Sequence, residues 1–116
     1  DLKELSLIGF SGGRDDQYFV NLQIMKKFTE IIKLTMYTDY SAIHCIKHRT
    51  QLKSHPGQTV SIISLHNKTQ IKTSGLKYSL NQSELKSPSH GISNIATGNS
   101  FTVHPSDCVW VFINHM

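Results

Sequence analysis

Residues 5–36 read LSLIGFSGGRDDQYFVNLQIMKKFTEIIKLTM, and the spacing of their apolar side chains changes twice. The run at 5–8 is typical of a short strand that ends at Gly9. Apolar residues then recur every three or four positions, as on one face of a helix that we expect from about Asp15 to about Phe28. These residues are Phe19, Leu22, Met25, Phe28 and Ile32. Alternation at 32, 34 and 36 indicates a second strand, so the stretch predicts a β-α-β unit, which usually belongs to a parallel α/β sheet.

The remainder of the chain has a different pattern. Short apolar runs of strand length are separated by turns rich in Gly, Pro, Asn and Ser, which favours a sandwich or barrel. These runs lie at 60–65, 76–80, 101–103 and 109–113. The fold class is therefore predicted as α+β, a β-α-β start followed by an all-β sandwich. We place the boundary between residues 1–47 and residues 48–116.

Composition narrows the classes of function. The 116 residues carry a net charge of +4, and 38% are hydrophobic, which is enough for a core. No apolar run approaches the roughly 18–20 residues of a membrane span, so we expect no membrane partner. The charge permits an anionic partner without selecting one, and we expect no nucleic acid. Two cysteines, Cys45 and Cys108, do not make a disulfide framework, and His44 and Cys45 would point to opposite faces of a strand, against a shared metal.

The loop at residues 11–17, between the first strand and the helix, is the first candidate site. Gly12 and Gly13 let the backbone approach a ligand closely, and the following helix start offers free N–H groups to an anion. Arg14 can bind phosphate oxygens through two hydrogen bonds. Asp15 and Asp16 would repel a bare phosphate, so they fit better with a divalent metal or a cationic ligand between. A tight turn before an acid-capped helix explains the same residues.

Two further candidates lie in the all-β part. Tyr78, after the turn at Gly75, can stack on a flat heterocycle if it is exposed, and it is an ordinary core aromatic if it is not. The polar turn at 91–94 contains Ser93 and Asn94, which can hydrogen-bond a ligand or simply form a turn.

Taken in order, these elements resemble the thiamine pyrophosphokinase family. The resemblance begins at residues 7–17, where Gly12-Gly13-Arg14 is followed by Asp16 and Gln17, and continues through the turn at 52–57. It is strongest at 73–80 and at 91–94, and it extends to the last strand pair at 103–113. The sequence departs from the family pattern at Asp15, where a bulky apolar residue is common, and at Ile95, where bacterial members often have Glu.

The resemblance implies a specific reaction and site. It implies transfer of pyrophosphate from ATP to thiamine, giving thiamine diphosphate and AMP, by a cytoplasmic homodimer that uses Mg²⁺. It assigns Asp16 and Arg14 to catalysis, and Gly12, Gly13 and Arg14 to nucleotide binding. Thiamine binding falls to four residues, Gln17, Tyr78, Ser93 and Asn94. No metal ligand is assigned in this chain, because the family's N-terminal segment holds those acids. The chain corresponds to about the C-terminal half of such an enzyme.

Two other functions fit parts of the sequence. Residues 11–16 also resemble the Ser-Gly-Gly-x-Asp-Ser loop of ATP pyrophosphatases, although Asp16 replaces the last Ser. A non-catalytic β-sandwich that binds a sugar or a protein fits the all-β part, but it leaves the loop at 12–16 unexplained.

Overall fold

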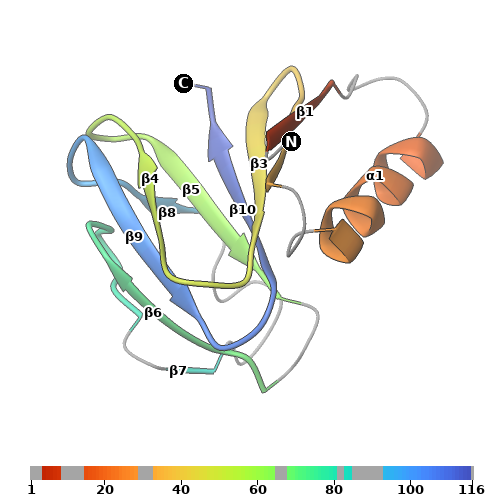
Figure 1. Cartoon of the computed structure of the whole chain (residues 1–116). Helices are drawn as coiled ribbons and strands as arrows, with labels where there is room; N and C mark the ends of the chain where they lie inside the picture. Colours follow the sequence, from red (N-terminus) through yellow and green to blue (C-terminus); the bar gives the residue numbers. More distant parts are fainter. Residues whose placement is uncertain are drawn as a thin grey trace.

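The structure is a computed structural model that describes residues 4–8, 15–28, 33–64, 68–80, 83–84 and 93–115. Side chains are described for 19–28, 34–64, 68–80 and 93–115. Within these ranges the chain is mostly β-sheet with one helix (Figure 1). The elements are β1 (Glu4–Ile8), α1 (Asp15–Phe28), β2 (Lys33–Tyr37), β3 (Ser41–Ile46), β4 (Thr50–Lys53), β5 (Thr59–Ile63), β6 (Gln70–Ser74), β7 (Ser83–Glu84), β8 (Asn94–Ile95), β9 (Ser100–Pro105) and β10 (Val109–Asn114).

The chain begins with the predicted β-α-β unit. Strands β1 and β2 are parallel neighbours, with Leu5 opposite Leu34, and α1 connects them. The helix has the predicted bounds, and Lys26 and Lys27 in its last turn offset the negative end of the helix dipole. At 14 residues it is too short to cross a bilayer, and no helix in the described residues is long and apolar enough to do so.

A six-stranded sheet joins this unit to the rest of the chain. Its strand order is β1-β2-β3-β10-β5-β8, and every pair after β1 and β2 is antiparallel. Hydrogen bonding between strands therefore continues across the predicted boundary at 47/48, because β1 to β3 precede it and β5, β8 and β10 follow it. The division of the chain into two domains at that point stays a prediction.

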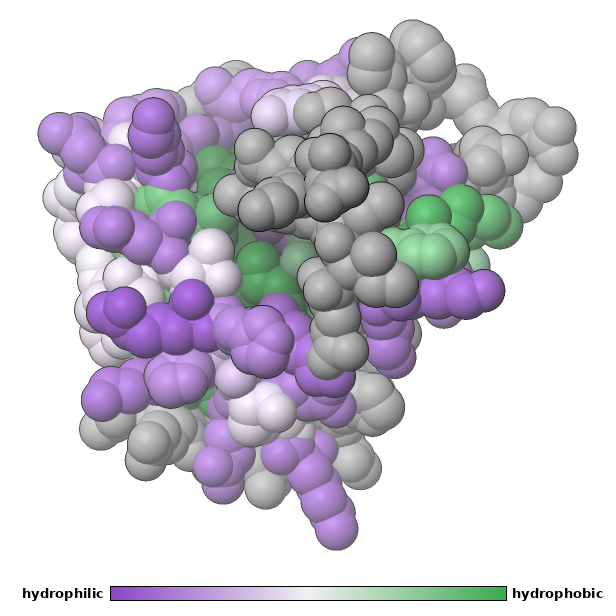
Figure 2. Space-filling view, viewed as in Figure 1, coloured by the Kyte–Doolittle hydropathy of each residue, from purple (hydrophilic) through white to green (hydrophobic). Residues whose placement is uncertain are grey.

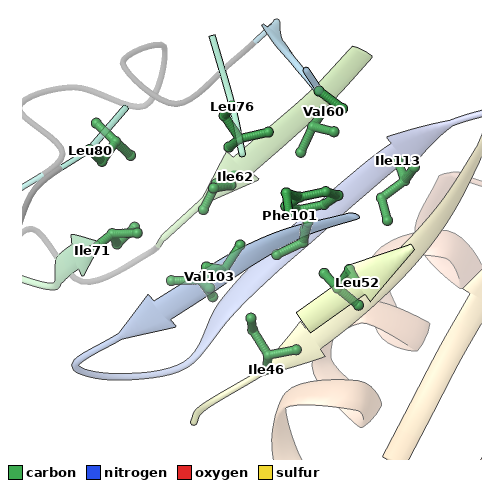
Figure 3. Close-up of a cluster of buried hydrophobic side chains, with 13 residues drawn as sticks. Ile46, Leu52, Val60, Ile62, Ile71, Leu76, Leu80, Phe101, Val103 and Ile113 are labelled. Atoms are coloured by element: carbon green, nitrogen blue, oxygen red, sulfur yellow. The ribbon is translucent and has the colours of Figure 1, made fainter. Parts of the chain in front are cut away.

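A four-stranded antiparallel sheet packs against one face of the first sheet. Its order is β4-β9-β6-β7. Side chains from both sheets point into the space between them and fill it (Figure 3). The cluster contains Ile46, Leu52, Val60, Ile62, Ile71, Leu76, Leu80, Ala96, Phe101, Val103, Val109, Val111 and Ile113. The all-β sandwich predicted from the sequence is thus confirmed.

Helix α1 covers part of the opposite face of the six-stranded sheet. Met25 is fully buried, the most buried of the helix residues whose side chains are described, and Leu22 and Phe28 pack against the same cluster. The strands contribute Leu34, Met36, Ile43, Cys45, Cys108 and Trp110. Phe19, which was expected on the buried helix face, is instead 60% exposed. In Figure 1 the start of α1 lies farther from the sheet than its end, so the first turns have less to pack against.

Strand β10 is apolar on both faces because both faces are covered. Val109, Val111 and Ile113 point into the sandwich, while Trp110 and Phe112 belong to the helix side. The sequence pattern predicted burial only for Val109, Val111 and Ile113, which alternate along the strand. A central strand between two layers reads as a continuous apolar run, as β10 does.

The segment from Leu76 to Leu80 differs from the predicted strand. Leu76 makes a single β-bridge with Ala96, and the residues after it form a bend. Leu76 and Leu80 are nevertheless buried in the sandwich, while Tyr78 between them is exposed. The predicted strand, with residues 76, 78 and 80 on one buried face, is therefore wrong at Tyr78, because the chain bends here instead of pairing as a strand.

Candidate ligand-binding site

The loop expected to bind nucleotide lies outside the described residues. Gly12, Gly13 and Arg14 are in this part, so their assigned roles stay predictions. Asp16 and Gln17 belong to the first turn of α1, but their side chains are not among those described. The structure thus fixes where this pair sits in the chain, directly at a helix start, where N–H groups are free to bind an anion.

The Gly75 turn is held tightly against the neighbouring strands. Gly75 has a φ of +84°, and a β-carbon added there would lie 2.8 Å from the carbonyl oxygen of Ser100. Only glycine meets both conditions without strain. The Gly75 carbonyl oxygen accepts hydrogen bonds from the Thr97 N–H at 3.0 Å and the Thr97 hydroxyl at 3.1 Å. Lys77 N–H also donates to the Ile95 carbonyl oxygen at 2.8 Å, so the turn is fixed on both sides.

Asn94 fixes the backbone of Tyr78. The side-chain oxygen of Asn94 accepts a hydrogen bond from the Tyr78 N–H at 3.0 Å, and from the Ile95 N–H at 2.9 Å. Its amide nitrogen donates to the Tyr78 carbonyl oxygen at 2.7 Å. The Asn94 side chain is buried, at 6% exposure. Its amide group makes the two hydrogen bonds to Tyr78 that the backbone of a neighbouring strand would otherwise make. Asn94 therefore positions Tyr78 in the protein, and its predicted direct contact with a ligand stays a prediction.

Ser93 lies beside this clamp in a left-handed backbone conformation, with a φ of 62°. Its N–H donates to the Ser61 hydroxyl oxygen at 3.0 Å, which joins the turn to β5. The Ser93 side chain is exposed. The structure thus brings Tyr78, Ser93 and Asn94 together at one edge of the sandwich, and a hydroxyl and an aromatic ring reach solvent there.

The ring of Tyr78 is available as a stacking surface. It is 58% exposed, although its backbone is fixed at both the N–H and the carbonyl. The Nζ atom of Lys77 lies 5.4 Å from the ring centroid, which is within the range of a cation–π contact. The ring therefore already attracts a positive charge, and a flat or cationic heterocycle is the kind of ligand that suits it.

Two shallow cavities lie elsewhere, on the outward face of the four-stranded sheet. One is lined by Gln70, Lys72, His104, Pro105 and Ser106, and the other by Arg49, Lys72, Thr73, Ser74, Thr102 and His104. Neither includes the Tyr78 ring. Small-molecule sites usually enclose most of the ligand, so an exposed platform like Tyr78 needs a second wall.

The polar turn was predicted at residues 91–94, of which 91 and 92 lie outside the described residues, Ser93 lies in a bend and Asn94 begins β8. The dependence of Tyr78 on Asn94 could not be read from residues 16 positions apart, and nothing in the pattern marked Lys77 or Ser61. Among the described residues, no three His, Cys, Asp or Glu side chains gather as a metal site would require.

The fold is a β-sandwich that follows a β-α-β unit, and its candidate ligand-binding surface lies at Tyr78. A family model described as "Thiamin pyrophosphokinase, vitamin B1 binding domain" matches residues 43–107. This match covers more than half of the chain, and it includes the Gly75 turn, Tyr78 and Asn94. The chain belongs to the family of thiamin pyrophosphokinase vitamin B1 binding domains.

Solved structures of thiamin pyrophosphokinases share the fold of the whole chain. The structure from Candida albicans has a TM-score of 0.83 at 20% identity, and the match covers 98% of this chain and 45% of that one. The structure from Bacillus subtilis has a TM-score of 0.81 at 21% identity, covering 97% and 55%. The yeast structure has a TM-score of 0.76 at 21% identity, covering 95% and 39%.

The chain thus spans about half the length of these structures or less. At such low identity the likeness concerns the fold alone. A comparison with curated protein sequences finds no significant match.

Proposed function

We propose that this chain is the C-terminal part of a thiamine pyrophosphokinase and that its sandwich binds thiamine. The observation that carries the proposal is the exposed Tyr78 ring on a backbone fixed by Asn94, inside the segment that matches the vitamin B1 binding family. Thiamine has a flat pyrimidine and a cationic thiazolium, and both suit an aromatic surface. Ser93 and Gln17 are assigned to thiamine binding as well.

The reaction in this proposal moves pyrophosphate from ATP to the hydroxyl of thiamine, giving thiamine diphosphate and AMP. Such transfers depend mainly on positioning and on neutralising charge. The N–H groups of Gly12 and Gly13 and the guanidinium of Arg14 hold phosphate oxygens, and Asp16 acts at the reacting end. Asp15 and Asp16 carry carboxylate oxygens of the kind that Mg²⁺ prefers, and a Mg²⁺ ion held beside them would neutralise phosphate charge.

The proposal includes a cytoplasmic homodimer. The Tyr78 surface is an open wall, and the second wall comes from the α/β part of the partner subunit.

The alternative of an ATP pyrophosphatase has less support from the fold. That class continues as an α/β sheet, whereas β2 is followed by antiparallel β3 and then by the sandwich. A sugar- or protein-binding sandwich would need no Asp16 and no nucleotide. Both alternatives predict that thiamine does not bind.

Asp16→Asn in the full protein tests the catalytic part, because it keeps the shape of the side chain and removes its charge. We expect AMP formation from ATP and thiamine to fall by about two orders of magnitude or more, with an unchanged Tm. Asp39→Asn, an exposed acid in the turn between β2 and β3, is the matched control and should leave the rate unchanged. Normal turnover in Asp16→Asn would remove that residue from the site, and absence of thiamine binding to the parent protein would reject the proposed function.

A further inference from the structure

The two cysteines of the chain meet under helix α1. Cys45 lies in β3 and Cys108 directly before β10, 63 positions apart in sequence, and their Sγ atoms are 2.8 Å apart. Neither is in a disulfide. In the ladder between β3 and β10, Cys45 is opposite Trp110, so Cys108 is its diagonal neighbour on the same face of the sheet. A covalent S–S bond measures about 2.05 Å, so less than about 1 Å of movement separates the pair from bonding distance.

The surroundings hold the two thiols next to each other and make Cys108 the more reactive of the two. Each cysteine is 5% exposed and lies among Met25, Met36 and Trp110. The hydrogen bond from Cys45 lowers the pKa of Cys108, and Lys26 and Lys47 lower it further, against burial and Asp107, which raise it. A thiolate is the attacking species in disulfide exchange, and Cys108 is therefore the first nucleophile.

We propose that Cys45 and Cys108 are a redox-responsive pair that closes into an intramolecular disulfide. The oxidant is a small disulfide of the glutathione class. The Cys108 thiolate attacks one sulfur of that disulfide, forms a mixed disulfide and releases one small thiolate. Cys45 then loses its proton and attacks the Sγ of Cys108, which expels the second small thiolate. Two protein thiols are oxidised and one small disulfide is reduced to two thiols.

The crosslink would join β3 to the start of β10 and so close a long loop of the chain. Strands β4 to β9, which include the whole four-stranded sheet, lie between Cys45 and Cys108 in the chain. A disulfide that closes a loop of this length restricts the unfolded chain much more than the folded one. Oxidation should therefore raise Tm, by roughly 5 °C or more. The proposal does not depend on thiamine binding or catalysis.

Trp110 supplies an internal reporter. It is the single tryptophan of the chain, and it is directly opposite Cys45 in the ladder. Formation of the bond replaces a thiol pair beside the indole with a disulfide. A change in Trp110 fluorescence should follow the same time course as loss of the thiols.

The experiment uses the full protein, reduced, desalted and incubated with oxidised glutathione under native conditions. We expect a mass lower by two hydrogens, a raised Tm and altered Trp110 fluorescence, all reversed by dithiothreitol. A tryptic digest without reductant should contain peptide 34–47 linked to the peptide that begins at Ser87 and contains Cys108. Oxidation of either cysteine alone, a link between two chains, or a link that forms only in denaturant would overturn the proposal.

Cys45→Ser and Cys108→Ser are the matched variants. Each should lose both the linked peptides and the effect of glutathione on Tm. Cys45→Ala and Cys108→Ala replace them if a buried hydroxyl prevents folding, and the measurement on the parent protein needs no variant. An equal rise in Tm in a single-cysteine variant would show that the crosslink is not the cause.

Discussion

The two covered faces of the six-stranded sheet are filled by different kinds of side chain. The sandwich side is aliphatic apart from Phe101, and two complete sheets close it. The buried cluster on the helix side contains two cysteines, two methionines, Leu34, Ile43 and Trp110, whose indole Nε1 is buried without a hydrogen-bond partner. Its cover is one helix that exposes Phe19, Val20 and Ile24, and Figure 2 shows hydrophobic surface on the side where α1 lies.

The two faces of the six-stranded sheet should therefore differ in how well they tolerate substitutions. A tightly packed aliphatic core gives one rigid arrangement, on which a turn such as Gly75–Tyr78 can be held. Sulfur and tryptophan side chains under a single helix tolerate change better, and they carry the reactive groups. We therefore expect substitutions in the sandwich to cost more than equal substitutions on the helix side.

The largest expected effect is that of Phe101→Ala, in the centre of the sandwich. Phe101 is 2% exposed, and its loss leaves a cavity between the sheets, so the free energy of unfolding should fall by about 3–5 kcal/mol. Phe19→Ala on α1 is the matched control, with an expected cost within about 0.5 kcal/mol. Urea denaturation measures both. Equal costs would mean that Phe19 is covered in the protein in solution and that the two faces are alike.

Gly75→Ala tests how rigidly the sandwich holds the turn at residues 75–78. The positive φ and the overlap with the Ser100 carbonyl oxygen should cost about 2–3 kcal/mol. Gly98→Ala is the control, because a β-carbon there meets nothing within 4 Å, and its cost should be near zero. A small cost for Gly75→Ala would show that the turn moves freely against β9.

Asn94→Ala removes the clamp on Tyr78. Three hydrogen bonds are lost and the partner groups of Tyr78 and Ile95 lose their pairing, so unfolding free energy should fall by about 1–3 kcal/mol. Ser93→Gly, one position away, keeps its backbone bond to Ser61 and relieves the positive φ, so it should be neutral. Hydrogen exchange at the Tyr78 amide provides a direct readout: protection there that survives Asn94→Ala would reject the clamp.

Tyr78→Ala should have the smallest effect on stability and a clear effect on binding. The ring is exposed, so unfolding free energy should change by less than about 0.5 kcal/mol. Thiamine affinity in the dimer should weaken about tenfold, or about 1.4 kcal/mol, while ATP affinity stays the same. Tyr78→Trp keeps a stacking face and is the matched control. Calorimetry measures both ligands, and unchanged thiamine affinity in Tyr78→Ala would remove the ring from the site.

Local patterns determined much of the fold. The change in apolar period across residues 5–36 predicted β1, α1 and β2, because a helix and a strand each need a fixed repeat to present one buried face. Short apolar runs separated by turns rich in Gly, Pro and Asn predicted the sandwich, because these residues favour turns between short strands. The bend after Leu76 was missed, since apolar residues at 76, 78 and 80 form the same sequence pattern whether the backbone continues as a strand or bends.

The sequence alone was enough to predict β1, α1 and β2, the all-β character of the remainder, and a tyrosine close to a glycine turn. Only the tertiary structure decided which of these residues meet. Asn94 reaches Tyr78 across 16 positions, and Cys45 reaches Cys108 across 63. Such contacts depend on strand order and register, and these are set by packing of the whole chain, which no local repeat encodes.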